Sequence, residues 1–158
     1  MSSPDSSRAA EFQGKGVASN PSRLVEVRSV FWSRNAGGVR HPHFVLTPMQ
    51  HESEQVIVVN CTSEKLDGAN GRPLPKQDYS CRLQVGDHEW ITLPSIMFYR
   101  GAELWTPREV QTEANPGTAN VSEHFVSKEL LFRMQRGLLD SRHTPMEVHE
   151  FLLSFRKK

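Results

Sequence analysis

Two short apolar segments of the chain each carry, at one end, polar side chains that could do chemistry. The first spans residues 40–47 and the second spans residues 55–63. The polar residues at their ends are Arg40, His41, His43, Thr62 and Ser63. A guanidinium binds a phosphate through paired N–H groups, an imidazole moves protons near neutral pH, and hydroxyls hydrogen-bond phosphate oxygens. If the segments are neighbouring strands, these groups converge on one rim, where a phosphate could be held and a proton moved.

The histidines admit two interpretations. His41 and His43 are two residues apart, so on a strand their side chains point to the same face, as an acid–base pair or two metal ligands would. No acidic residue or third histidine lies directly beside them, and His88, in the turn sequence 86–89, could join them only through the fold. The alternatives are two half-exposed histidines on a rim and, for His88, ordinary turn chemistry. Because zinc-ligand spacing, a Gly-rich phosphate loop and a nucleophile elbow are all missing from the sequence, we predict no metal or cofactor.

Short apolar runs predict strands rather than helices, whether the apolar residues alternate with polar ones or follow one another without a break. Besides the two segments above, the predicted strands are residues 24–32, 80–85, 90–93 and 95–99. Turn-forming clusters fall at residues 35–38, 66–75 and 86–87. Five or six short strands with tight turns indicate a small β-barrel or a strongly bent sheet over residues 22–105. Cys61 and Cys81 fall inside predicted strands, where we expect buried free thiols rather than a disulfide.

The period of the apolar residues changes toward the C-terminus. Residues 106–124 are polar and contain prolines, so they are predicted to form a linker or loop. Residues 125–158 are predicted to form a helical hairpin. The first helix carries an apolar stripe of Val126, Leu130, Met134 and Leu138. The second begins at Thr144, Pro145 and Glu147, as a Thr N-cap with Pro at the first position, and carries a stripe of Val148, Phe151, Leu152 and Phe155. Something must cover that second stripe, which favours a homodimer.

Composition excludes some classes of protein. The chain has 158 residues, of which 37% are hydrophobic and 23% charged, as in an ordinary globular domain. No apolar run is long enough to cross a membrane, and the N-terminus lacks the apolar core of a secretory signal, so a cytoplasmic protein is predicted. Residues 1–21 are rich in Ser, Ala, Gly and Pro and are predicted to be disordered.

Charge is unevenly distributed along the chain. Residues 22–124 contain ten basic and twelve acidic side chains, whereas residues 125–158 contain seven basic and four acidic ones. Nucleic-acid binders usually carry a basic stripe or domain, and the β portion carries none. This charge balance therefore supports an alternative hypothesis, in which the protein is a non-catalytic interaction module whose helical hairpin docks a protein partner.

The strand order resembles that of MazF/PemK-type toxins over about residues 24–102. Residues 40–47 are similar to the family strand in which an arginine precedes a proline and an apolar run. Residues 55–63 are similar to the following strand, which ends in a comparable Thr-Ser, and residues 95–102 resemble a later strand. Two departures, His41 between Arg40 and Pro42 and a different start to the first strand, leave a binding-only relative as the alternative.

The resemblance implies an SH3-like barrel, a homodimer, ribosome-independent RNA cleavage and an antitoxin-like protein partner. In that family an arginine and a threonine are the catalytic pair, which correspond to Arg40 and Thr62. The predicted reaction is metal-independent attack of the ribose 2′-OH on the neighbouring phosphorus, with His41 or His43 moving protons. Ser63 and His88 are the further residues predicted to contact RNA.

Overall fold

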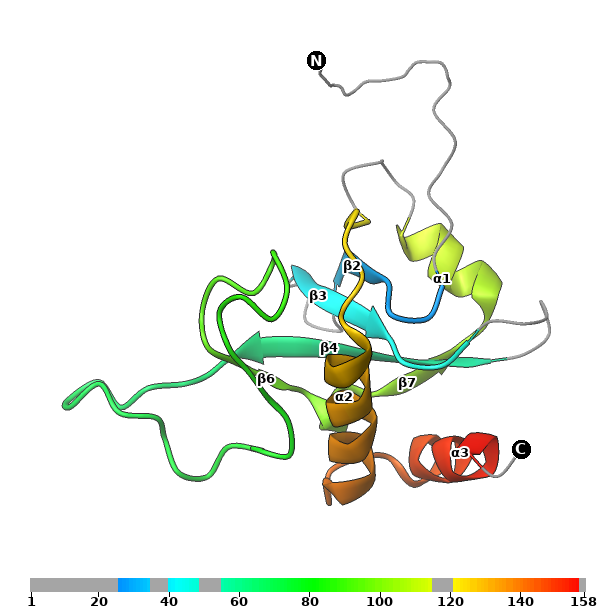
Figure 1. Cartoon of the computed structure of the whole chain (residues 1–158). Helices are drawn as coiled ribbons and strands as arrows, with labels where there is room; N and C mark the ends of the chain where they lie inside the picture. Colours follow the sequence, from blue (N-terminus) through cyan, green and yellow to red (C-terminus); the bar gives the residue numbers. More distant parts are fainter. Residues whose placement is uncertain (1–25, 35–39, 49–54, 115–120, 157–158) are drawn as a thin grey trace, which may run out of the picture.

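A computed structural model describes residues 26–34, 40–48, 55–114 and 121–156, and the segment predicted to be disordered, 1–21, lies outside them. An antiparallel six-stranded sheet is followed by helices (Figure 1). The strands are β2 (Val30–Arg34), β3 (Arg40–Val45), β4 (Val56–Ser63), β5 (Arg82–Leu83), β6 (Ser95–Met97) and β7 (Glu103–Trp105). The helices are the 3-10 turn η1 (Tyr99–Gly101), α1 (Pro107–Ala114), α2 (Lys128–Asp140) and α3 (Met146–Arg156).

Strand β4 is the centre of the sheet because both of its edges are paired. One edge pairs with β3, where His43 lies opposite Asn60. The other edge is divided between β6, which pairs with residues 61–63, and β7, which pairs with residues 56–58. The sheet runs β2-β3-β4-β6-β5 and is open, since its end strands β2 and β5 are not paired with each other in the described part of the chain. A mainly-β portion followed by helices is thus confirmed. The described strands do not close into a barrel, and the SH3-like fold stays a prediction.

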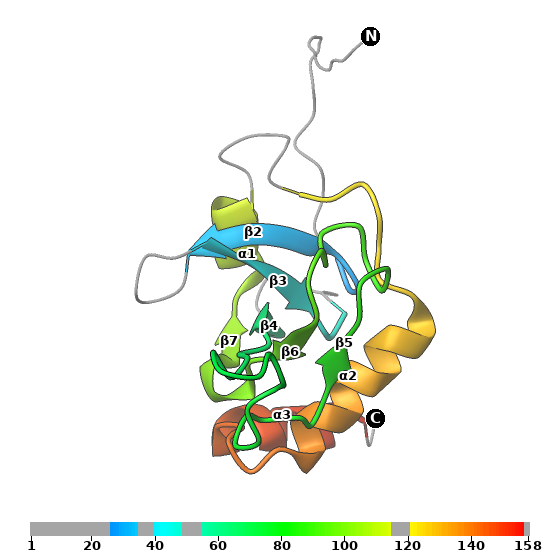
Figure 2. The ribbon, with the colours of Figure 1, turned by 90° about the vertical axis from the view of Figure 1, so that its left-hand side faces the viewer.

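Two hydrophobic cores lie on opposite faces of the sheet, and each is covered by different helices. Phe44, Ile57 and Val59 point into the larger core, which α2 and α3 cover. Val45 and Val58, their neighbours in sequence, point into the smaller core with α1. Figures 1 and 2 show α1 on one side of the sheet and the two C-terminal helices on the other. Burial on both faces explains why residues 56–59 are a continuous apolar run rather than an alternating one.

Four of the predicted strands differ from the structure. The run 80–85 forms a strand only at Arg82–Leu83, and the run 95–99 only at Ser95–Met97. The first strand was expected over residues 24–32 but begins at Val30, because Arg28 adopts a left-handed conformation with φ of +74° that an extended strand cannot contain. Residues 24 and 25 lie outside the described residues. The run 90–93 forms a turn and not a strand, since it passes over the end of β4 rather than beside another strand.

The predicted linker at 106–124 was wrong for its first half, which forms α1. Thr106 and Glu109 make a reciprocal capping box: the Glu109 N–H donates to the Thr106 hydroxyl at 3.2 Å, and the Thr106 N–H donates to the Glu109 carboxylate at 2.8 Å. The signature Thr-Pro-x-Glu is therefore a real start signal here. At the second copy of this signature, the Thr144 hydroxyl instead donates to the Leu138 carbonyl at 2.7 Å.

The two C-terminal helices are confirmed, and their apolar stripes are covered within the chain. Ser127 caps α2 by accepting from the Leu130 N–H. Val148 and Leu152 of α3 are fully buried in the larger core, and Phe151 and Phe155 pack against it. The covering of this stripe therefore does not require a second copy, and the homodimer rests on the family resemblance alone.

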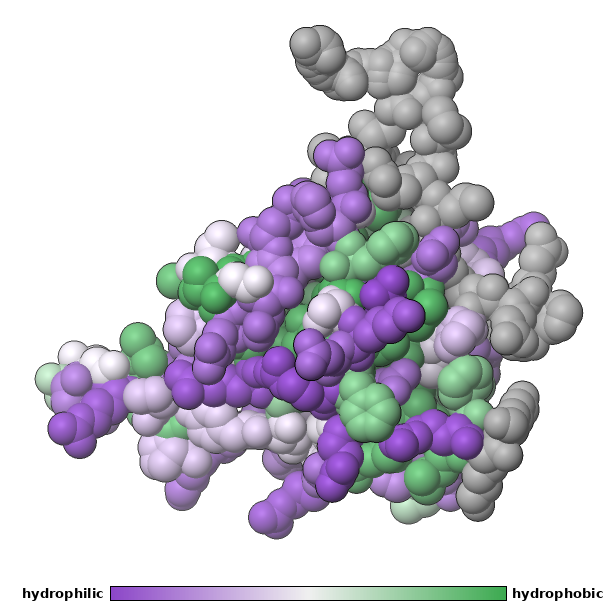
Figure 3. Space-filling model, in the orientation of Figure 1, coloured by the Kyte–Doolittle hydropathy of each residue, from purple (hydrophilic) through white to green (hydrophobic). Residues whose placement is uncertain are grey.

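The outer surface is mostly polar. No helix among the described residues is both long and apolar enough to cross a membrane. Figure 3 shows the face over α2 as mainly hydrophilic, with small apolar areas between the polar side chains.

Gly137 is the residue on which the docking of α2 depends. A Cβ there would lie 2.8 Å from the Ser80 carbonyl oxygen and 2.9 Å from the Cys81 Cβ, and it would also meet the Tyr99 hydroxyl. That hydroxyl donates to the Met134 carbonyl at 2.7 Å and holds α2 against the sheet. We expect Gly137→Ala to lower the free energy of unfolding by about 1–3 kcal/mol through overpacking, although alanine favours the helix by about 1 kcal/mol.

Urea denaturation measures this, with Gly68→Ala as the control, since no atom lies within 4 Å of the added Cβ at Gly68. An unchanged or higher stability of Gly137→Ala would mean that α2 can move away from the sheet without cost.

The homodimer is tested by light scattering at micromolar concentration. We expect a mass of twice the 17.9 kDa of one chain, as the resemblance implies. A mass close to that of a single chain would contradict the prediction.

Candidate functional site

One cavity of about 260 Å³ opens where β3 begins and β4 ends, and we call it the rim cavity. Four of the predicted site residues line it: Arg40, His41, Thr62 and Ser63. They meet because β3 and β4 are antiparallel, so the start of one strand lies beside the end of the other. These four residues thus lie around one rim, although their side chains do not all point to the same place.

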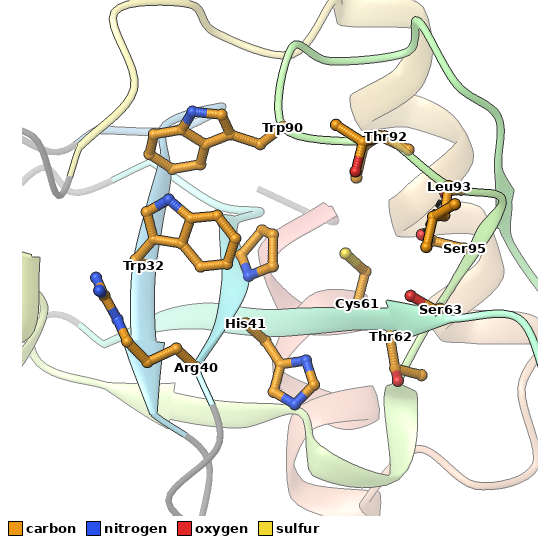
Figure 4. A pocket seen from close by; sticks show the side chains of 12 residues that line it. Trp32, Arg40, His41, Cys61, Thr62, Ser63, Trp90, Thr92, Leu93 and Ser95 are labelled. Atoms are coloured by element: carbon orange, nitrogen blue, oxygen red, sulfur yellow. Dashed lines mark hydrogen bonds between the residues drawn. The ribbon is translucent and has the colours of Figure 1, made fainter.

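Two tryptophans form the wall of the rim cavity. The rings of Trp32 and Trp90 are stacked, with centroids 5.2 Å apart and planes 30° from parallel. The Arg40 guanidinium carbon lies 5.7 Å from the centre of the Trp32 ring, within the range of a cation–π contact. Figure 4 shows the Arg40 side chain running beside Trp32 at the edge of the cavity.

Sequence reasoning missed this aromatic wall. The local pattern places Trp32 and Trp90 only within the predicted strands 24–32 and 90–93. The pairing of Trp32 with Pro42 puts the tryptophan next to Arg40 and His41, and that register could have been inferred once β2 and β3 were recognised as a hairpin. The turn at 88–91 brings Trp90 over the sheet from far along the chain, and no local signal predicts this.

The lining residues of β3 and β4 point to two sides of the strand pair. In Figure 4 the Cys61 side chain points into the space between the tryptophans and Ser95, whereas His41 and Thr62 point away from the tryptophans on the other side. Successive side chains on a strand alternate between faces. The site therefore has an aromatic half and, across the strand edge, a half with an imidazole and a hydroxyl.

His43 does not line the rim cavity. Its ring is buried between Phe31, whose centroid is 5.6 Å away, and Trp105, at 6.1 Å. Its Nδ1–H donates to the His41 carbonyl at 2.8 Å. Burial lowers the pKa of His43 below the usual histidine value, since the charged ring would lose its hydration. It is placed as a neutral core residue rather than as one half of an acid–base pair in the cavity.

His88 also lies outside the cavity lining, but it holds one of its walls. Its Nδ1 accepts the Trp90 backbone N–H at 3.1 Å, and its Nε2–H donates to the His124 carbonyl at 2.8 Å. The bond that Nδ1 accepts requires the neutral ring, and burial lowers the pKa of His88 in the same sense. His88 therefore positions Trp90 and does not reach a ligand in the rim cavity directly.

The electrostatics of the rim cavity favour an anion. Its twelve lining residues include Arg40 and His41 and no Asp or Glu. Cys61 faces the cavity, but burial raises the pKa of its thiol to about 12, so it carries no thiolate to act as a nucleophile or metal ligand. Cys61 and Cys81 are both free and buried, as predicted. Among the described residues no group of three or more His, Cys, Asp or Glu side chains could hold a metal ion.

Comparison of the chain with protein-family models, with curated proteins and with solved structures gives no match. The site is therefore interpreted from its own geometry.

The two buried histidines predict how stability depends on pH. Both have a lower pKa in the folded protein than in the unfolded chain, so the unfolded chain takes up protons first as the pH falls. The free energy of unfolding should decrease as the pH falls from about 8 through the ordinary histidine value of about 6.5, and should go on decreasing toward the lowered values. Chemical denaturation at several pH values measures this.

His43→Phe removes one of these titrating rings while keeping an aromatic ring in the same packing, so its stability should depend less on pH than that of the wild type. An equal slope in both proteins would contradict the assignment of His43 as a neutral buried ring.

Proposed function

We propose that the rim cavity holds one unpaired base of an RNA strand while Arg40 binds a neighbouring phosphate. The composition of the lining carries this proposal: two tryptophans, an arginine and several hydroxyls, with no acidic side chain. Bases of single-stranded RNA stack on aromatic rings and guanidinium planes, which contributes about 1–3 kcal/mol per base. The volume of about 260 Å³ is smaller than the roughly 300–1,000 Å³ of typical ligand pockets, which fits one ring system.

The chemistry proposed at this site is metal-independent cleavage of the RNA. The ribose 2′-OH attacks the neighbouring phosphorus, the bond to O5′ breaks, and a 2′,3′-cyclic phosphate forms. In this proposal the phosphate lies over the strand edge, where Arg40 on the aromatic side stabilises the charge that develops on the phosphorane and Thr62 on the other side hydrogen-bonds one of its oxygens. His41 accepts the 2′-OH proton, and water supplies a proton to O5′.

Placement of the other candidate residues supports assigning the proton transfer to His41. It is the only histidine among the lining residues of the rim cavity, whereas His43 and His88 are buried and hydrogen-bonded elsewhere. Ser63 lines the cavity beside Thr62 and is the second hydroxyl available to a phosphate oxygen.

A second candidate function is a protein-docking module, for which an antitoxin-like protein is the proposed partner. The observation in its favour is the set of large apolar side chains on the C-terminal helices that are open to solvent. They are Phe132, Met146 and Leu153, exposed to 58%, 74% and 39%. In this alternative the rim cavity plays no part and the helices provide the contact.

Cleavage of a single-stranded RNA in buffer containing EDTA tests the first proposal. We expect cleavage with a cyclic phosphate product, and we expect Arg40→Gln to reduce the rate by about 10²–10³-fold, as for loss of a group that stabilises transition-state charge. Arg108→Gln on the exposed surface of α1 removes the same charge outside the cavity and should cleave like the wild type.

Three other outcomes are informative. Cleavage that stops on chelation contradicts the metal-independent reaction. RNA binding that weakens steeply with salt but produces no cleavage supports a binding-only protein. An absence of RNA affinity at any salt concentration contradicts the RNA proposal and favours the docking module.

A further inference from the structure

A second cavity, of about 480 Å³, lies between β5 and α2. Three of its seven lining residues are arginines, Arg82, Arg133 and Arg136, and Phe132 stands among them. The remaining lining residues, Ser80, Cys81 and Gln84, carry no carboxylate. We call this the arginine cavity.

The arginines of this cavity are held in place by contacts that leave most of their donors unused. Arg82 pairs with the buried Glu64 carboxylate at 2.9 Å. Arg133 donates to the Arg82 carbonyl at 2.7 Å and lies 3.9 Å from the Asp87 carboxylate. Arg136 faces Asp140 at 3.4 Å in a pair that is mostly exposed, with 69% and 59% of the two side chains accessible. Exposed pairs of this kind contribute little, and each guanidinium has five N–H groups to donate. The cavity is thus a preformed place for anionic oxygens.

Phe132 adds an aromatic surface to this basic group. Its ring is 58% exposed, and the Arg156 guanidinium carbon of α3 lies 5.7 Å from the centre of the ring. Exposed aromatic rings beside arginines are the combination that single-stranded nucleic acid uses, because bases stack while phosphates pair with the cations.

The arginine cavity and the rim cavity lie on two strands that pair with each other, β5 and β6. Leu83 of β5 pairs with Ser95 of β6, and Ser95 lines the rim cavity, while Arg82 and Gln84 on either side of Leu83 line the arginine cavity. The Glu64 that holds Arg82 directly follows Ser63, the last residue of the rim cavity on β4. Figure 2 shows β5 lying against α2 at this place. The Glu64–Arg82 pair therefore joins the end of β4 at the rim cavity to the arginine cavity.

We infer that the arginine cavity binds the phosphodiester backbone of the same single-stranded RNA, beyond the base held in the rim cavity. This inference rests on the proposed function of the rim cavity. It accounts for a basic site in a chain whose β portion has a net acidic balance, because the arginines of α2 complete a surface that β5 alone does not supply.

The test compares a short and a long RNA. Fluorescence anisotropy is measured, with wild-type protein, for a labelled oligouridine of about three residues and one of about twelve. The longer RNA should bind more tightly, and Arg136→Gln should weaken its binding about tenfold, as for one charge-assisted contact. The salt dependence of log K should fall in slope by about 0.7. Binding of the short RNA should not change.

Arg136 is suited to this test because its side chain is largely in solvent, so the variant should fold, and circular dichroism checks this. Arg136→Lys should recover most of the affinity for the long RNA and should restore the wild-type salt dependence of log K. Arg142→Gln, which removes an exposed charge between α2 and α3, is the matched control and should bind both RNAs like the wild type.

The outcomes separate the two proposals. Short and long RNAs that bind equally, with no effect of Arg136→Gln, overturn the arginine cavity and leave the rim cavity as proposed. A wild-type protein that binds neither RNA overturns the RNA function and this inference with it. An effect of Arg136→Gln on binding of an acidic peptide, but not on binding of the long RNA, overturns the inference in favour of a protein ligand.

Discussion

Burial of β4 on both faces is the constraint on which the rest of the structure depends. Every residue from Val56 to Cys61 is buried, with one set of side chains in the core under α2 and α3 and the other under α1. Both edges of the strand are also paired, so its backbone groups are satisfied without water. Packing on both faces and pairing on both edges hold the strand in position. The residues at its end, Thr62 and Ser63, are therefore held in position as well.

The rim cavity lies at the end of β4, where the burial of the strand stops. Beyond Cys61, Thr62 is half-buried and Ser63 is exposed, and at the paired end of β3 Arg40 is exposed in the same way. Polar groups gather there because the strand ends lie outside both cores, where such groups keep access to water. The two tryptophans form one wall of the cavity and leave it open to solvent. His88 holds Trp90 by accepting its backbone N–H, which only the neutral imidazole can do.

The charge around each cavity is set by the tertiary structure and cannot be read from the net charge of a segment of the chain. The chain as a whole carries +1 and residues 22–124 carry a net −2, yet neither of the two cavities has an acidic residue in its lining. Glu64, Asp87 and Asp140 pair with Arg82, Arg133 and Arg136 from outside the cavity lining, where they orient the arginines. A count of charges along a segment is therefore weak evidence against an anionic ligand, because the potential depends on which charges face the ligand.

The sequence by itself determined the strands β3 and β4, the two C-terminal helices, the buried cysteines and the meeting of Arg40 and His41 with Thr62 and Ser63. These follow from local period and from the rule that antiparallel neighbours bring opposite ends together. Only the tertiary structure decided that Trp32 and Trp90 would form the wall, that His43 and His88 would be buried, and that Arg133 and Arg136 would face Arg82. A local pattern states which residues need to be buried, but not which distant segment covers them. The two Thr-Pro-x-Glu sequences illustrate this limit: at Thr106 the hydroxyl caps the helix, whereas at Thr144 a carbonyl of the preceding helix lies within reach and takes the hydrogen bond instead.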